Sequence, residues 1–175
     1  MTSSPTWTAP AVERRDSVPT GERTSLDHFL DWHRETLLHK CAGLTGEQLN
    51  SRPLPMTSLS LLGLIRHMAL VERWWFRMRF FNDDSLEQIF TTEEDRDGDF
   101  NAGTAESAEA DYAVYLEEAD LARKAVAGHD LDEEFQGRRQ VMSLRWVYLH
   151  MIEEYARHLG HADLLREAID GVTGE

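Results

Sequence analysis

The stretch SLRWVYLHMIEEYARHLGHADLLREAIDG, residues 143–171, predicts one long helix over about 143–169. Ser143 is a favourable N-terminal cap, and Gly171 is a residue type that commonly ends a helix. Apolar residues recur at helical spacing and mark the side expected to face a core: Leu144, Val147, Met151, Tyr155 and Leu165. A helix of this length is stable only when that side packs against other helices, so the stretch favours a helical bundle.

Three more amphipathic segments precede this one. They cover about 25–42, 59–81 and 104–127, and their expected caps are Thr24 or Ser25, Ser58 or Ser60, and Thr104. We expect short helical turns at Thr45 and near 86–90, and we see no convincing strand. Four long helices in 175 residues predict an all-α four-helix bundle with long connections that cross it or cover one end.

Residues 1–22 are rich in Ser, Thr, Pro and Arg and show no periodicity. This composition favours a flexible N-terminal tail or an arm that packs late, with residues 23–175 forming the bundle domain.

The charge balance narrows the classes of partner. The chain has 18 Lys and Arg against 32 Asp and Glu, a formal net charge of −14. Such a chain repels phosphate backbones and anionic lipid surfaces, so we expect it to bind neither nucleic acid nor membranes. Its single cysteine, Cys41, permits no internal disulfide, and residues 1–11 lack the basic and apolar segments of a signal peptide. We therefore expect a cytoplasmic protein.

Four side chains able to bind a metal form one stripe on the last helix: His150, Glu154, His158 and His161. They fall within about 80° of arc, because a helix turns about 100° per residue. One ion cannot contact all four, since His150 and His158 are about 12 Å apart along the axis. The pairs Glu154/His158 and His158/His161 can each chelate an ion. Glu154 and His158 flank the buried line, so we expect this pair to point into the bundle.

His67 supplies a third ligand. It lies on the most apolar face of the 59–81 helix, where a buried histidine is otherwise ordinary core packing. His67, Glu154 and His158 together would form a site with three protein ligands and open positions, which is typical of catalytic metals. Mixed imidazole and carboxylate ligands suit Zn²⁺ first, and also Fe²⁺, Mn²⁺ or Ni²⁺.

Two motifs of this sequence resemble the DinB superfamily of metalloenzymes. They are LSLLGLIRHMALVERWWF, residues 59–76, and HMIEEYARHLGHADLLRE, residues 150–167. The similarity extends over about residues 25–172 and is closest to the mini-circle-protein subgroup of actinobacteria.

This resemblance implies a bundle with up-down-down-up order and a long crossover. It also implies a divalent metal on His67, Glu154 and His158, where most members have three histidines and the mycothiol-dependent maleylpyruvate isomerases have His, Glu and His. Those isomerases carry a second, C-terminal domain that this sequence does not contain, so we do not expect that isomerase reaction.

The resemblance further implies a thiol-dependent activity. We expect a metal-dependent thiol S-transferase, in which a low-molecular-weight thiol such as mycothiol reacts with an electrophilic small molecule. His33 or His161 would act as acid, base or positioning partner, and Trp74 or Tyr155 would line the pocket for the substrates. A metal-dependent hydrolase and a non-catalytic metal-binding bundle are the alternatives. The aromatic stretch 74–81 suggests a homodimer in each case.

Overall fold

A computed structural model describes residues 6–173. Its elements in chain order are α1 (Glu22–Cys41), α2 (Gly46–Asn50), α3 (Leu61–Glu72), the π-helix η1 (Arg73–Arg79), α4 (Gly98–Asn101), α5 (Ala108–Ala125), β1 (Glu134–Gln136), β2 (Val141–Ser143) and α6 (Leu144–Asp170). The chain is mostly helical, which confirms the predicted class. No helix within residues 6–173 combines the length and the apolar character needed to cross a membrane.

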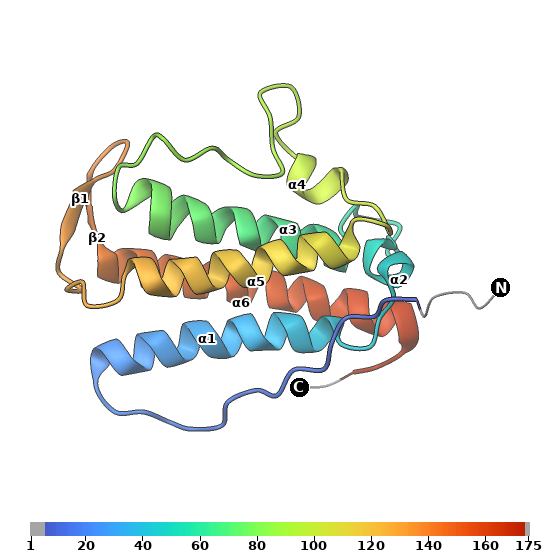
Figure 1. The fold of residues 1–175 in the computed structure, drawn as a ribbon. Coiled ribbons are helices and arrows are strands. Elements are labelled where there is room, and N and C mark those ends of the chain that lie inside the picture. The colour runs from blue at the N-terminus through green and yellow to red at the C-terminus, as the bar shows by residue number, and fades with distance from the viewer. Residues whose placement is uncertain (1–5, 174–175) are drawn as a thin grey trace.

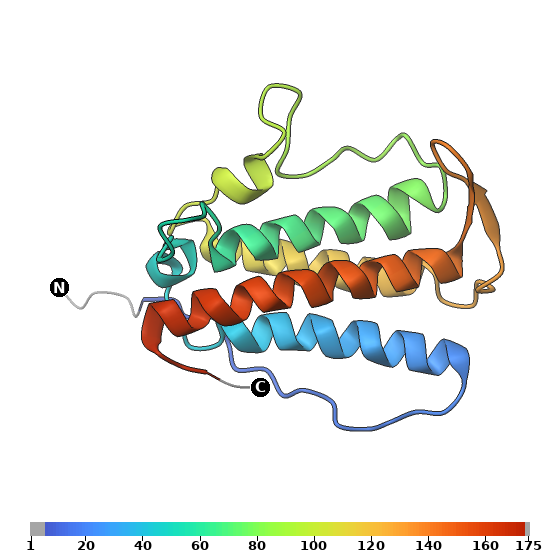
Figure 2. The ribbon, with the colours of Figure 1, turned by 180° about the vertical axis from the view of Figure 1, so that it is seen from behind.

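Four long helical segments lie side by side (Figure 1). α1 packs against α6, and α3 packs against both α5 and α6. In Figure 1, α1 and α6 run from left to right, whereas α5 and α3 with its continuation η1 run from right to left. Large apolar side chains from all four segments fill the interior, among them Leu37, Ile65, Phe76, Tyr115 and Met151. The view from behind shows α3 and α6 as neighbours along most of their length (Figure 2).

The ends of α6 confirm the cap and the stop signal. The Ser143 hydroxyl accepts a hydrogen bond from the Trp146 amide, and Gly171 has the left-handed conformation with φ of 78°. Ser60 likewise caps α3 through the Gly63 amide. The predicted turn at Thr45 is α2, where Thr45 and Gln48 form a reciprocal capping box.

Other boundaries differ from the expectations. α1 begins at Glu22, so neither Thr24 nor Ser25 is its cap. α5 begins at Ala108, because Thr104 and Ser107 bond to each other in a separate turn. No helix forms at 86–90; the helical turn in that connection is α4.

The expectation of no strand was wrong. β1 and β2 form an antiparallel hairpin in which Phe135 is paired with Met142, and this hairpin leads directly into α6. Each strand has only three residues, too few for a period-two pattern to be distinguished from loop.

Residues 6–21 contact the bundle rather than standing apart from it. Trp7 packs edge-on against Tyr112 of α5, and Ala9 is buried where its amide donates to the Leu44 carbonyl. Further along, the Arg15 guanidinium pairs with Asp31 and Glu35 of α1. Residues 6–21 therefore lie along the bundle, held by apolar contacts near Ala9 and by ion pairs at Arg15. Residues 1–5 of the predicted tail lie outside the described residues.

Candidate metal centre

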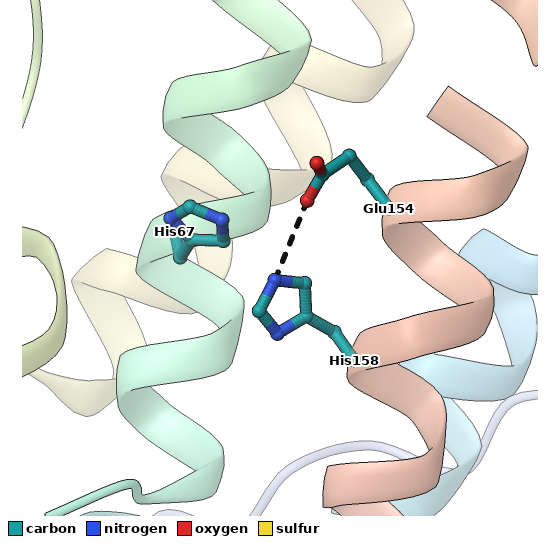
Figure 3. Close-up of side chains that lie close together, drawn as sticks. All are labelled: His67, Glu154 and His158. Atoms are coloured by element: carbon teal, nitrogen blue, oxygen red, sulfur yellow. Dashed lines mark ion pairs between the residues drawn. The ribbon is translucent and has the colours of Figure 1, made fainter. Parts of the chain in front are cut away.

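Two neighbouring helices bring His67, Glu154 and His158 together (Figure 3). His67 projects from α3, and the other two project from successive turns of α6. One ligand atom from each residue can be chosen so that all three lie within 4.8 Å of one another. This is the set that the helical spacing and the resemblance both predict.

The centre is partly shielded from water. The side chains of His67, Glu154 and His158 keep 17%, 16% and 10% of their exposed surface. The three side chains are therefore neither sealed in the core nor fully exposed. The position follows from the sequence, because a spacing of four residues places Glu154 and His158 one above the other on the same side of α6.

Asp99 on α4 fixes the orientation of His67. Its Oδ2 lies 2.8 Å from Nδ1 of His67, so a proton on Nδ1 is donated to the carboxylate and Nε2 keeps its lone pair. The ring of Phe100 also stacks on the His67 imidazole, with the two ring centroids 4.4 Å apart. A carboxylate behind a ligating histidine is the usual second partner in metal sites.

Sequence reasoning missed Asp99. It lies in the connection over residues 82–99, which is rich in acidic residues and reads from the sequence as solvent-exposed, yet its side chain is almost fully buried. The Arg66 guanidinium helps to hold it there by donating to the Asp99 and Gly98 carbonyls and to the Asp111 carboxylate. The sequence carries no local signal for this contact, because thirty-two residues separate the two partners.

His158 is held in its neutral form. Burial is the largest cause that lowers the pKa of His158, and together with the neighbouring imidazoles of His67 and His161 it brings that pKa to about 4. Its Nε2 is 3.5 Å from the Glu154 carboxylate, and its Nδ1 is 3.5 Å from Nδ1 of His161. A neutral imidazole is the form that binds a metal.

The donor set fits a divalent cation. Two imidazoles and one carboxylate converge, a carboxylate supports one of the imidazoles, and the other is neutral at physiological pH. A carboxylate so close to two histidines at a shielded position is also stabilised by a cation.

The remaining predicted site residues lie in different surroundings. His161 contacts His158, as described above. His33 is nearly buried on α1, where its Nδ1 is 2.6 Å from the Phe29 carbonyl and its ring packs on Trp32. Within residues 6–173, no hydrogen bond or ring contact joins His33 to His67, Glu154 or His158.

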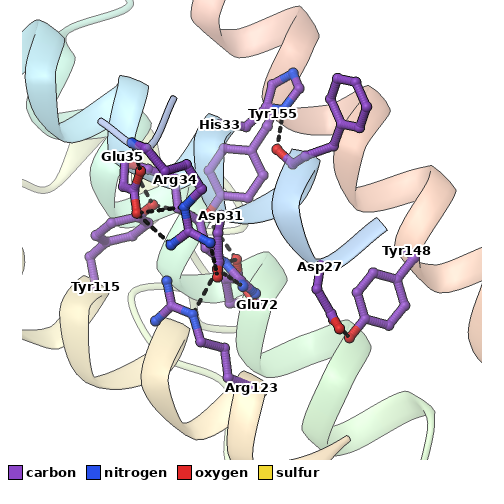
Figure 4. A network of polar contacts seen from close by, with 12 residues as sticks. Asp27, Asp31, His33, Arg34, Glu35, Glu72, Tyr115, Arg123, Tyr148 and Tyr155 are labelled. Carbon is purple, nitrogen blue, oxygen red and sulfur yellow. Dashed lines mark hydrogen bonds and ion pairs between the residues drawn. The ribbon is translucent and has the colours of Figure 1, made fainter. Parts of the chain in front are cut away.

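Tyr155 is fully buried in a polar network between α1, α3 and α6 (Figure 4). Its hydroxyl donates to the Glu72 carboxylate at 2.7 Å, and Glu72 also accepts two hydrogen bonds from the Arg34 guanidinium. Burial raises the pKa of Tyr155 well above its ordinary value, and the charge of Glu72 raises it further. Tyr155 therefore remains protonated and acts in the core rather than at a pocket surface.

Trp74, by contrast, lines a cavity of about 500 Å³ between η1, the hairpin and the start of α6. Trp75 and Trp146 form further walls of this cavity. The cavity lies one side chain away from the metal centre: His150 contacts both Trp75 and Trp146, and its Nε2 is 3.7 Å from Glu154.

Cys41 takes no part in this site. It is fully buried, and burial raises the pKa of its thiol to about 12, which removes the thiolate that a nucleophile needs.

Comparison with known proteins adds one finding. A family model described as Mycothiol-S-transferase matches residues 25–171, which is most of the chain and includes His67, Glu154 and His158. No curated protein and no solved structure matches.

Proposed function

The chain belongs to the mycothiol S-transferase family, and on that premise we propose that it is a divalent-metal-dependent enzyme that joins mycothiol to an electrophilic small molecule. The observation that carries the metal dependence is the convergence of His67, Glu154 and His158 within 4.8 Å. The directions of the four long helices support the up-down-down-up arrangement of DinB-like proteins for this chain.

The metal proposed for the centre is Zn²⁺, with Ni²⁺, Fe²⁺ or Mn²⁺ as the other ions that this donor set accepts. When bound, such an ion supplies the positive charge that lowers the pKa of a thiol and makes the thiolate available at neutral pH. Three protein ligands leave room for that thiol beside them.

The residues of the chain have separate tasks in this proposal. Asp99 holds His67 so that Nε2 faces the centre, and burial keeps His158 neutral. Of the two predicted acid–base residues, geometry supports His161, whose Nδ1 is 3.5 Å from His158. We assign it to accept the proton that the thiol releases or to position His158.

In a substitution, the thiol sulfur forms a bond to carbon and the leaving group departs with the electron pair of the broken bond. The thiol proton passes to His161 or to water. Both substrates would approach the ligands from the side where His67 and Glu154 keep part of their surface exposed.

The first test is the metal content of the untagged protein, measured by plasma mass spectrometry. We expect about one divalent ion per chain in the wild type and its loss in His158→Ala. His39→Ala is the matched control, because His39 is a half-buried histidine of α1 whose nearest partner is the Val12 carbonyl. A wild type that stays free of metal after soaking, with its fold intact, contradicts the proposal.

The second test measures consumption of mycothiol with a generic electrophile, with and without a chelator. We expect transfer that stops when the metal is removed and returns when it is restored. Turnover that needs no thiol would instead indicate a hydrolase with a metal-activated water.

A further inference from the structure

The cavity beside the metal centre combines aromatic walls with positive charge. Trp74, Trp75 and Trp146 form its apolar surface, and Arg79, Arg138 and Arg139 also line it. The guanidinium groups of Arg79 and Arg138 lie 5.3 and 5.6 Å from the ring of Trp74. A flat apolar molecule finds stacking partners here, and its charged end finds cations.

These three arginines differ from the others of the same region. Arg73 and Arg77 both pair with Glu118, whereas within residues 6–173 no carboxylate pairs with Arg79, Arg138 or Arg139. The chain as a whole has a net charge of −14, whereas this cavity carries three guanidinium groups without a carboxylate partner and is therefore locally positive. An acidic surface repels anions, so this cavity is a place to which an anion is directed.

The cavity and the candidate metal centre both lie where α3–η1 packs against α6. Trp75 follows His67 by eight residues, and Trp146 precedes Glu154 by eight residues. The α3–η1 segment runs toward the hairpin and α6 runs away from it (Figure 2). Both tryptophans therefore come on the hairpin side of the centre, where they line the cavity together with hairpin residues. His150 stacks on Trp146 at 4.7 Å and reaches Glu154 at 3.7 Å, so it forms the boundary between cavity and centre.

We propose that this cavity binds the electrophilic substrate and selects one with an apolar, flat body and a negatively charged group. The tryptophans hold the body, the arginines hold the anion, and the reactive carbon points past His150 toward the thiol. That the bound molecule is the substrate rests on the proposed transferase function. The preference of the cavity for a flat anion does not depend on that function.

Binding is tested without any reaction, by calorimetry on the full-length protein with two unreactive ligands of equal shape. 2-Naphthoate carries the charge, and 2-naphthamide does not. We expect the wild type to bind naphthoate about tenfold more tightly, which corresponds to two exposed charge contacts. In the double variant Arg138→Ala/Arg139→Ala, the ratio of the two dissociation constants falls toward one.

Arg14→Ala is the matched control, because Arg14 also lies over a tryptophan, Trp32, at 5.6 Å but far from this cavity along the chain. We expect this variant to keep the wild-type ratio. His158→Ala should also keep naphthoate binding, since it removes a proposed metal ligand and no cavity residue. Equal affinity for both ligands in the wild type, or an unchanged ratio in the double variant, overturns the proposal.

The role as substrate site is tested with 4-(chloromethyl)benzoate and 4-(chloromethyl)benzamide as electrophiles for mycothiol. The thiol sulfur bonds to the benzylic carbon, chloride leaves with the electron pair, and the thiol proton is released. We expect kcat/KM to favour the benzoate about tenfold in the wild type and to lose that preference in the double variant. Transfer without preference overturns the substrate role. Naphthoate selectivity with no transfer of either compound instead overturns the transferase proposal and leaves the binding site in place.

Discussion

At the scale of single residues, the candidate metal centre depends on which groups orient and protonate its two histidines. His67 has two ring nitrogens, and the contact of Nδ1 with Asp99 decides that the other one faces Glu154 and His158. His158 has no carboxylate behind it of this kind, and burial is the main reason that its pKa is low. The two histidines are thus prepared by different means, one by a hydrogen bond and the other by desolvation.

Asp99→Asn tests the first of these means. The amide can still accept a hydrogen bond but no longer stabilises the protonated Nδ1, so we expect zinc affinity to fall about 10- to 100-fold. Competition with a chromophoric chelator measures it. Asp97→Asn, two residues away, is the control, because that side chain is exposed and makes no capping hydrogen bond at the start of α4. Equal losses in both variants would show a general effect of the charge of this loop.

At the scale of elements, the short helix α4 is positioned by its close approach to α3. A Cβ added to Gly63 would lie 2.9 Å from the Phe100 carbonyl oxygen, nearer than side chains normally come. Glycine at this point therefore lets α4 approach far enough for Asp99 to reach His67, one turn further along α3.

Gly63→Ala should push α4 away from α3. We expect a lower melting temperature together with weaker zinc binding, both measured on the same preparation by calorimetry. The control is Gly160→Ala in α6, whose added Cβ meets no atom within 4 Å. That variant should gain roughly 0.5–1 kcal/mol in stability, since alanine favours helix over glycine. A Gly63→Ala protein that binds zinc normally would argue against this role of α4.

A second contact between elements is a group of buried hydrogen bonds at the junction of α3 and η1. Glu72, the last residue of α3, is fully buried and takes hydrogen bonds from Arg34 of α1 and Tyr155 of α6. Three of the long helical segments of the bundle thus meet at one carboxylate.

Glu72→Gln removes the charge and leaves Arg34 buried without an ionic partner on that side. Breaking a buried pair in this way costs about 3–5 kcal/mol, so we expect the melting temperature to fall by roughly 6–20 °C in a protein of this size. Glu109→Gln on the exposed side of α5 should change it by only a degree or two. A small shift in Glu72→Gln would mean that the glutamine re-forms the contacts.

At the scale of the whole molecule, acidic residues outnumber basic ones, whereas the region between α3–η1 and α6 contains histidines and the arginines without a carboxylate partner. The described structure assigns no surface to a partner copy. Of the aromatic stretch that suggests a homodimer, Phe76 and Phe80 are buried and Trp75 packs on Trp146. A homodimer stays a prediction from the sequence.

The neutral state of His158 makes the stability of the metal-free protein depend on pH. Its pKa is about 4 in the folded protein and about 6.5 when unfolded, so the unfolded chain takes up the proton first on acidification. We therefore expect stability to be lost as the pH falls from about 6.5 toward 4. Urea titrations in EDTA across this range should show a steeper decline for the wild type than for His158→Ala. Parallel declines would assign the loss to other groups.

The sequence by itself determined the features that depend on local periodicity. The stripe on α6, the caps at Ser60 and Ser143 and the stop at Gly171 all follow from residues within a few turns of each other. The same reasoning located Glu154 and His158 on one side of a helix and His67 on the apolar side of another, which was enough to predict the metal-binding set.

Tertiary structure alone decided what joins distant segments. The bond from His67 to Asp99, the burial of Tyr155 beside Glu72, and the docking of the hairpin next to Trp74 each connect residues more than thirty positions apart. Such contacts are set by how whole helices pack, and an acidic loop or a tyrosine on a helix has the same local pattern whether or not it reaches a partner. That is why the ligands could be read from the sequence, while the residue that orients one of them, and the cavity beside them, could not.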